Sequence, residues 1–379
     1  MNRREFLMAS TVAGLAASTR FAAAATRIDM YTSSDANVSD FYGNVVKPAF
    51  EAANPGLELN VVIARPQAAL DAVVQRALAA LSTKSDPQLD FIEQYEPTLP
   101  AGGIEAGLWT DFGKAGLKSY AAVNKLAIQT PYGLPYRGSQ VLIAYDTTKL
   151  SKDKVPKTFP DLVAWIKANP GEFIYNRPDK GGSGNNFVNR AVHEVSGRDP
   201  LKFTVDNYSQ ATADEVLGKT WALLGDLAPS LYQGGAYTAG NTASLQLLAQ
   251  GAVTMIPAWS DQTLQAIAKG VLPETTGLVQ LTDLALCGGF SQAVIPTNSA
   301  HFEGSLKLAD FLLSQEMQTA IIEKLGGFPG VDWSNLPQAL HDKYADVIPS
   351  SIPTFPAGDW TKAVQDGWYR NVAPNISRT

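Results

Sequence analysis

YGLPYRGSQVLIAYD, residues 132–146, interrupts an alternation of helix and strand patterns that otherwise runs through the chain. Its first half is rich in polar and glycine residues, and the apolar run Val141–Ala144 that follows has the pattern of a strand that ends in a turn. Such a segment does not continue the alternation of strands and helices that builds an α/β layer. We therefore expect residues 132–146 to form the first crossing between two lobes.

The sequence before this crossing predicts a βαβ unit. Arg27–Tyr31 and Leu57–Ile63 have the pattern of strands, and apolar residues recur at helical spacing from Phe41 to Phe50 between them. Ser39 is a suitable N-cap for that helix. A unit of this kind opens a mostly parallel sheet. The elements expected next are a helix around Leu70–Leu81 and a short strand over Leu89–Ile92.

The sequence after the crossing continues the alternation and then returns. The expected elements are a helix over Phe159–Lys167, a strand over Glu172–Tyr175, a helix entered by the glycine-rich turn Lys180–Asn185, a helix from an N-cap at Asn241 to Gln250, a strand over Val253–Ala258 and a long amphipathic helix over Phe302–Leu325. Leu284–Pro296 is expected to cross back, and Gly326–Gly330 marks a third turn. Without a leader the chain keeps about 350 residues, which exceeds one typical core and predicts two lobes.

The first 25 residues have the features of an export signal. The pair Arg3-Arg4 precedes an apolar stretch, Leu7–Ala17, that is too short to span a bilayer. Ala22–Ala25 supplies a small-residue cleavage site, and the paired arginines match the twin-arginine type of leader. We expect the mature chain to begin near Thr26; a buried N-terminal helix is the structural alternative.

The composition limits the class of partner. The net charge is −6, and it becomes −8 when three Arg and one Glu leave with the leader. An acidic chain has no electrostatic attraction for nucleic acid or acidic lipid. No stretch after the leader has the roughly 18 uninterrupted apolar residues of a membrane helix. Cys287 is the only cysteine, which argues against a disulfide, a multi-cysteine metal site and a lipid anchor. We expect a freely diffusing monomer whose partners are small molecules or proteins.

Three motifs resemble those of a known family. They are Val141–Asp146 after the first crossing, Gln250–Met255 leading into a strand, and Gly289–Pro296 before a long helix. Together they resemble the extracellular solute-binding proteins of bacterial ABC importers, in the type II class that includes maltose, polyamine, iron and thiamine binders. Tyr132–Ser139 and Gly181–Phe187 are most similar to its YnjB-type branch.

The resemblance implies an α/β fold of the periplasmic-binding-protein-like type II, with two α/β lobes joined by a multi-strand hinge and a ligand cleft between them. It places residues 26–137 and 291–328 in lobe 1, and residues 138–290 and 329–379 in lobe 2. It also implies a periplasmic protein without enzymatic activity, cofactor or metal, which delivers a small polar or charged organic ligand to the permease of an ABC importer. A protein that presents its ligand to a sensor would have the same sequence features.

One group of candidate site residues suits a negatively charged ligand. Ser183, Gly184 and Asn185 lie where the glycine-rich turn enters a helix, so that backbone N–H groups and the helix dipole could hold an anion. Arg177, just before the turn, could add a bidentate contact. The first crossing contributes a second cationic and polar pair, Arg137 and Ser139. An ordinary capped turn and a structural hydrogen bond at the hinge are the alternatives.

A second group suits a protonated or quaternary amine, because aromatic faces and carboxylates follow the expected strands. These residues are Tyr31, Glu93, Tyr95, Trp259 and Asp261. Further hydrogen-bonding partners are Ser34, Asp35 and Asn241, although Asn241 also suits an N-cap. Tyrosine and tryptophan are equally common in cores. The two groups favour opposite ligand charges, which a zwitterion or a ligand with separate charged ends would reconcile.

Motifs of enzymes and metal sites match poorly. Gly181–Asn185 is close to a nucleophile elbow but ends in Asn, and a hydrolase would need Ser183 to act with His193 and Asp179. Gly218-Lys219-Thr220 lacks the first glycine of a phosphate-binding loop and has the pattern of a helix interior. The three histidines, His193, His301 and His341, have no ligand partner at metal-site spacing, and the chain has no adjacent tyrosine pair of the kind that iron-binding relatives use. Binding without chemistry is the leading hypothesis, and an exported serine hydrolase is the alternative.

Overall fold

The computed structural model describes residues 25–34, 36–65, 67–204, 207–345, 347–348, 353 and 355–378. The expected leader with Arg3-Arg4, and the candidate residue Asp35, lie outside the described residues. The strands are β1 (Thr26–Thr32), β2 (Leu57–Ile63), β3 (Phe91–Glu93), β4 (Leu134–Asp146), β5 (Met255–Trp259), β6 (Thr276–Val279), β7 (Gly288–Val294) and β8 (Phe328–Pro329).

The α-helices cover these strands. They are α1 (Ala36–Phe41), α2 (Lys47–Ala53), α3 (Gln67–Thr83), α4 (Phe159–Ala168), α5 (Gly182–Val195), α6 (Gln210–Leu227), α7 (Asn241–Ala249), α8 (Ser260–Ala268), α9 (Phe302–Leu312), α10 (Gln315–Ala320), α11 (Gln338–Tyr344) and α12 (Asp359–Asn371). One-turn π-helical segments, Tyr42–Val46 and Ile321–Leu325, extend α1 and α10. Over the described residues, no helix combines the length and the apolar character that crossing a bilayer requires.

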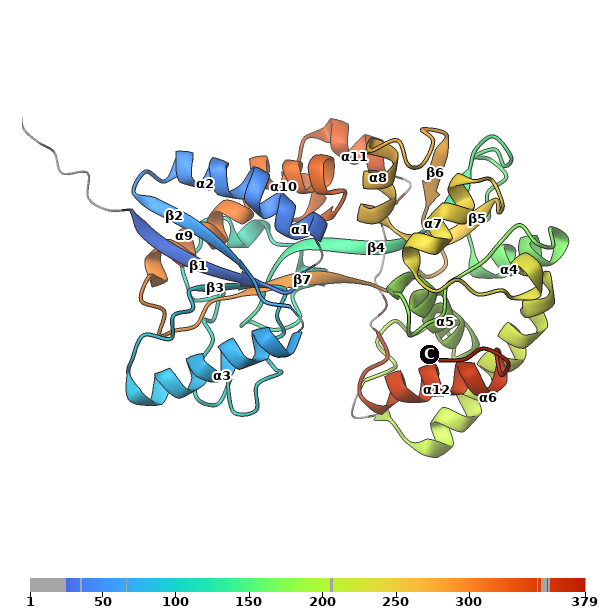
Figure 1. Ribbon diagram of the computed structural model, residues 1–379, viewed down its shortest axis with the longest axis horizontal. Coiled ribbons are helices and arrows are strands. Elements are labelled where there is room, and N and C mark those ends of the chain that lie inside the picture. The colour runs from blue at the N-terminus through green and yellow to red at the C-terminus, as the bar shows by residue number, and fades with distance from the viewer. Residues whose placement is uncertain are drawn as a thin grey trace, which may run out of the picture.

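Strand β4 joins the two halves of the molecule (Figure 1). Its first part, Leu134–Gln140, pairs with β7, and its second part, Val141–Asp146, pairs with β5 and β6. Strand β7 runs beside it in the opposite direction, from the second half back to the first (Figure 1). The crossings expected at residues 132–146 and 284–296 are therefore the two hinge strands.

The strand order is β2-β1-β3-β7-β4-β5, and β6 and β8 also pair with β4. Strand β1 is parallel to β2 and β3, which confirms the predicted βαβ unit. The expectation of a mostly parallel sheet is wrong for the whole molecule, because every pairing of β4 and β7 is antiparallel. A chain that crosses a hinge and returns must run in both directions there.

The buried apolar residues form two large cores. The first core lies between the sheet β1–β3 and the helices α1, α2, α9 and α10, with α3 on the other face of the same sheet (Figure 1). The second core gathers α4, α5, α6, β5 and the C-terminal helix α12. Each half thus buries its own apolar surface, as expected for a chain of this length.

The chain continues to pack in the first core beyond residue 329, where we predicted the boundary between the lobes. Val331, Leu336 and Leu340 are buried in the first core, and Val123 forms an isolated bridge with Val331. Helix α12, through residues such as Trp360, then packs in the second core. The reason is that β8 pairs with β4 just before this segment, and the sequence pattern does not show this pairing.

Three local predictions were wrong. Ser39 is not an N-cap but lies inside α1, where its hydroxyl donates to the carbonyl of Ala36. The long helix expected over 302–325 breaks at Leu313–Ser314, because Ser314 is extended and its side chain caps α10 by accepting from the Met317 N–H. The strand expected over Glu172–Tyr175 is reduced to an isolated bridge at Phe173.

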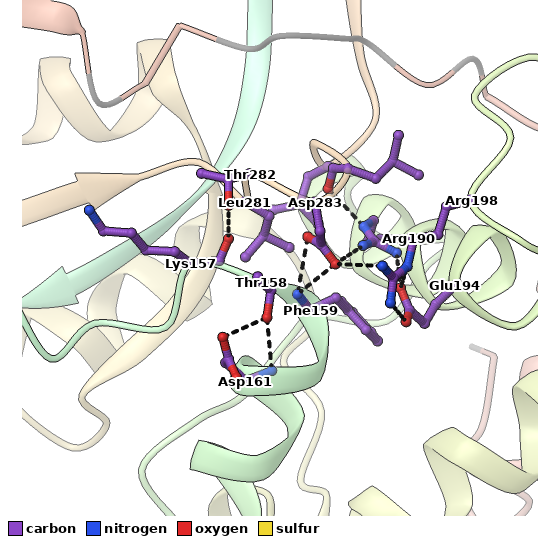
Figure 2. Close-up of polar contacts among 12 residues, drawn as sticks. Lys157, Thr158, Phe159, Asp161, Arg190, Glu194, Arg198, Leu281, Thr282 and Asp283 are labelled. Atoms are coloured by element: carbon purple, nitrogen blue, oxygen red, sulfur yellow. Dashed lines mark hydrogen bonds and ion pairs between the residues drawn. The ribbon is translucent and has the colours of Figure 1, made fainter.

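A buried ionic network fixes α5 in the second half (Figure 2). The guanidinium of Arg190 is fully buried and contacts the carboxylates of Glu194 at 2.8 Å and Asp283 at 3.0 Å. Asp283 also accepts from the N–H of Phe159 at the start of α4. The network therefore joins α4, the C-terminal half of α5 and the connection between β6 and β7.

Candidate ligand-binding site

Several candidate residues meet at the hinge, and we name Thr32, Glu93, Tyr136, Arg137, Ser139 and Asp261 the hinge cluster. Glu93 is completely buried at the end of β3. Its carboxylate accepts from the hydroxyl of Thr32 at 2.6 Å and from the hydroxyl of Tyr136, and Arg137 Nη2 lies 3.4 Å away. Residues from β1 and β4 thus surround the carboxylate that β3 supplies.

Arg137 is charged and held on two sides. Burial alone would lower the pKa of its guanidinium, but the neighbouring Tyr136, Glu93 and Asp261 together raise it. Its Nε donates to the hydroxyl of Tyr136 at 2.8 Å. Burial is also the main cause that raises the pKa of Tyr136, so that its phenol stays protonated. Arg137 and Glu93 therefore neutralise each other inside the protein.

Asp261 connects the two halves at this cluster. It lies in the first turn of α8, and its Oδ1 accepts from the hydroxyl of Ser139 in β4 at 2.8 Å. Its Oδ2 lies 3.4 Å from the side-chain amide of Asn37 in α1. A residue of the second half thus contacts a hinge strand and a helix of the first half.

A second group, which we name the cap cluster, consists of Asn176, Ser183, Gly184 and Asn241. Asn176 Oδ1 accepts from Ser183 Oγ at 2.6 Å and from the Gly184 N–H at 2.8 Å. Asn241 Oδ1 accepts from the Ser183 N–H at 3.2 Å and lies 2.8 Å from Ser183 Oγ. The two asparagines therefore occupy the N–H groups at the start of α5, where the sequence suggested an anion.

The glycines of the turn allow close packing. A Cβ on Gly184 would overlap the backbone carbonyl of Asn176, and a Cβ on Gly181 would overlap the Asn241 side chain. A Cβ on Gly182 would lie 2.6 Å from the ring of Trp259, so the indole covers this glycine. The sequence Gly-Gly-Ser-Gly is thus explained by contacts with Asn176, Asn241 and Trp259 rather than by a flexible loop.

Gly184→Ala should destabilise the protein by about 1–3 kcal/mol, because its methyl group must displace the backbone at Asn176. Gly218→Ala in α6 is the matched control, since no atom lies within 4 Å of its added Cβ and alanine favours the helix interior. Urea unfolding followed by circular dichroism measures both variants. Equal midpoints for Gly184→Ala and the unchanged protein would show that Asn176 does not pack as described.

The two clusters adjoin through three consecutive residues. Trp259 ends β5 beside Gly182, Ser260 begins α8, and Asp261 joins the hinge cluster.

A family model for the bacterial extracellular solute-binding proteins matches residues 46–346.

The chain belongs to this family.

Solved structures show the same fold for this solute-binding protein. An extracellular solute-binding protein from Bordetella parapertussis matches 92% of this chain and 99% of its own, with 16% identity and a TM-score of 0.69. Ferric iron-binding protein A of Mannheimia haemolytica, in an open conformation, matches 93% and 100% with 13% identity and a TM-score of 0.64. A periplasmic thiamin-binding protein matches 92% and 96% with 16% identity and a TM-score of 0.57. No curated protein sequence matches the chain.

The structure brings most of the candidate residues of this solute-binding protein together. Ser34, two residues after β1, donates its N–H to the Thr32 hydroxyl and contacts Gln94 through its own hydroxyl. The candidates in or beside the two clusters are Ser34, Glu93, Arg137, Ser139, Ser183, Gly184, Asn185, Asn241, Trp259 and Asp261. They come from segments far apart in the sequence, as a site between two halves requires.

Three candidates lie elsewhere. Tyr31 and Tyr95 face α3 and pack in the apolar cluster there, and the Tyr95 ring contacts Trp109 at an interplanar angle of 49°, with ring centroids 5.8 Å apart. Alternation along β1 explains this, because Tyr31 and Thr32 face opposite sides of the sheet. Arg177 donates to the carbonyl of Ser377, so its guanidinium faces the C-terminal segment rather than α5.

Sequence reasoning missed or misplaced several site residues. Asn176 and Tyr136 were not identified, because an Asn after a strand and a Tyr beside an Arg are common in cores. Asn241 is not the N-cap of α7 but its first residue, after Gly240, and its side chain caps α5 instead. A signal for this role did exist, since the α5 turn has no Ser, Thr, Asp or Asn at position 181.

The hydrolase alternative does not fit this geometry. Ser183 is completely buried against two asparagines, whereas His193 lies ten residues further along α5, about 15 Å away. His193 Nδ1 bonds to the carbonyl of Asp199, and Asp179 accepts from the hydroxyl of Tyr369. Gly218-Lys219-Thr220 lies inside α6, as predicted. Among the described residues, no three His, Cys, Asp or Glu side chains gather as metal ligands would.

Proposed function

We propose that this solute-binding protein captures a small polar or charged organic ligand between its two halves and delivers it to the permease of an ABC importer. The observation that carries the proposal is the convergence of the hinge cluster and the cap cluster at Trp259–Asp261. The hinge cluster joins strands of the first half to Asp261 of the second half, and the cap cluster lies around the start of α5 in the second half. Loops at these positions are where α/β folds bind ligands.

The fold supplies the means of capture. Two halves joined by two long antiparallel strands can close like a hinge on a ligand that contacts both. A ligand bound between them shifts the population toward the closed form in proportion to its preference for that form. The solved neighbours whose names state a ligand bind ferric iron or thiamin, which supports a small ligand and leaves its identity open.

The remaining features of the proposal follow from the sequence. We propose export by a twin-arginine leader ending near Ala25, a periplasmic location, a monomeric state, no catalytic activity and membership of the YnjB-type branch. The charge of the chain, its single cysteine and the motif Tyr132–Ser139 support these points.

Thermal unfolding tests the proposal without knowledge of the ligand. A deproteinised bacterial metabolite extract should raise the melting temperature, because a compound that binds only the folded state stabilises it by mass action. A stabilisation of about 2.7 kcal/mol is expected when the ligand is present at 100 times its Kd. An extract that leaves the melting temperature unchanged at every dilution would count against ligand capture.

A further inference from the structure

We infer that the ligand is an organic cation, held between the carboxylate of Asp261 and the ring of Trp259; this inference rests on the proposed function. The sequence left the sign of the ligand charge open. In the structure, side chains of the protein occupy the N–H groups that would hold an anion, and the hinge cluster has one carboxylate more than it has cations, two residues after Trp259.

The groups that could bind an anion are already engaged. Asn241 Oδ1 accepts from the N–H of Ser183, and Asn176 Oδ1 accepts from the N–H of Gly184. These two donors in the first turn of α5 are therefore already bonded to side chains of the protein. The N–H of Asn185 lies 3.3 Å from the carbonyl of Gly181. An anion at this helix start would have to displace the buried amide of Asn176 and the partly buried amide of Asn241, which costs the hydrogen bonds they make.

The nearby basic side chains face other directions. Arg177 donates to Ser377 and Lys180 to Arg378, both in the C-terminal segment. Arg65 follows β2, and β1 separates that strand from β3 and Glu93. Arg137 is buried against Glu93 and Tyr136. These four basic side chains therefore add no free cation to the two clusters, as far as the described part of the chain shows.

The charges that remain do not balance. The described residues of the two clusters contain two carboxylates, Glu93 and Asp261, and one guanidinium, Arg137. Glu93 takes the closer contact with Arg137, while Asp261 is bound by the neutral donors of Ser139 and Asn37. Asp261 is only 8% exposed. Arg137 attracts both carboxylates, so one negative charge of this buried cluster remains uncompensated, and a positively charged ligand would balance it.

Trp259 provides the second half of the recognition. It lies two residues before Asp261, its ring packs over Gly182, and its side chain remains partly exposed. The face of an indole attracts a cation by about 0.5–2 kcal/mol, depending on how far water is excluded. An excess carboxylate and an aromatic side chain two residues away in the chain suit a protonated or quaternary amine rather than a hard metal ion, which prefers several oxygen ligands.

The test uses a bacterial metabolite extract divided by ion exchange into cationic, anionic and neutral fractions. We expect the cationic fraction to raise the melting temperature and the other two to leave it unchanged. Stabilisation by the anionic or neutral fraction alone would overturn the inference but leave ligand capture intact. Stabilisation by no fraction would overturn ligand capture itself, and the inference with it.

A charge-removing variant locates the effect. Asp261→Asn should weaken binding of the active compound in the cationic fraction by at least about 30-fold, since truncating one partner of a buried charge pair costs 2 kcal/mol or more. Asp226→Asn is the control, because its carboxylate is 66% exposed and pairs with Lys167 far from both clusters. Equal dilution curves for Asp261→Asn and Asp226→Asn would contradict a role of Asp261 in binding the cation.

Discussion

Arg137→Met should lower the free energy of unfolding by about 3–5 kcal/mol, because it leaves the carboxylate of Glu93 buried without its cation. Glu93 would keep the hydroxyls of Thr32 and Tyr136 as donors, but these neutral groups do not compensate a full charge. Chemical denaturation followed by tryptophan fluorescence measures the loss.

The double variant Glu93→Gln with Arg137→Met separates charge from packing. Removing both charges should restore most of the stability, because the amide oxygen can accept from one of the hydroxyls of Thr32 and Tyr136 while its NH2 group donates to the other, without a buried ion. If the double variant is as unstable as Arg137→Met alone, the loss arises from packing around β4. In that case our description of Glu93 and Arg137 as a charge pair would be wrong.

Arg190→Met should cause a loss of similar size, about 3–5 kcal/mol, in the second half. Its guanidinium is fully buried between Glu194 and Asp283, and its Nε donates to the carbonyl of Leu284 at 2.9 Å (Figure 2). The substitution leaves Asp283 with the backbone N–H of Phe159 and a long contact of 3.9 Å to Arg198.

Arg198→Met is the matched control, since Arg198 contacts the same two carboxylates but its side chain is 42% exposed. An exposed pair contributes about 1 kcal/mol or less, so this variant should unfold close to the unchanged protein. Comparable losses for the two arginine variants would contradict the importance of burial in this network.

Acid should weaken the same network. Burial alone would raise the pKa of Glu194, but hydrogen bonds from Arg198 and Arg190 outweigh it and lower the pKa. A carboxylate with a lowered pKa contributes stability that is complete above its ordinary pKa, about 4.3, and is lost as the pH falls through the folded value. The stability difference between Arg190→Met and the unchanged protein should therefore shrink below about pH 4.

The fold was predictable where local pattern determines it. The βαβ unit at the N-terminus, the hinge segments 132–146 and 284–296, and the position of Trp259–Asp261 after a buried strand all follow from periodicity and turn residues. The break at Ser314 and the return of residues 331–340 to the first core do not, because a cap and a two-residue strand pairing compete with a strong helical pattern.

The site was predictable only in part, for a related reason. Polar residues that follow strands were found, since all such ends meet at one edge of an α/β layer. Which direction each side chain faces depends on contacts across the fold. Tyr31 turned toward α3, and Arg177 toward Ser377, while Asn176 became the central acceptor of the cap cluster. Spacing along one sequence carries no information about these partners.

Small-angle X-ray scattering tests ligand capture between the two halves most directly. The radius of gyration of the protein should decrease when a stabilising metabolite fraction is added, because the halves close around β4 and β7. The measurement should be repeated with Trp259→Leu, which should show no compaction at the same ligand concentration. A fraction that raises the melting temperature while the scattering curves of free and bound protein coincide would contradict closure on a ligand between the two halves.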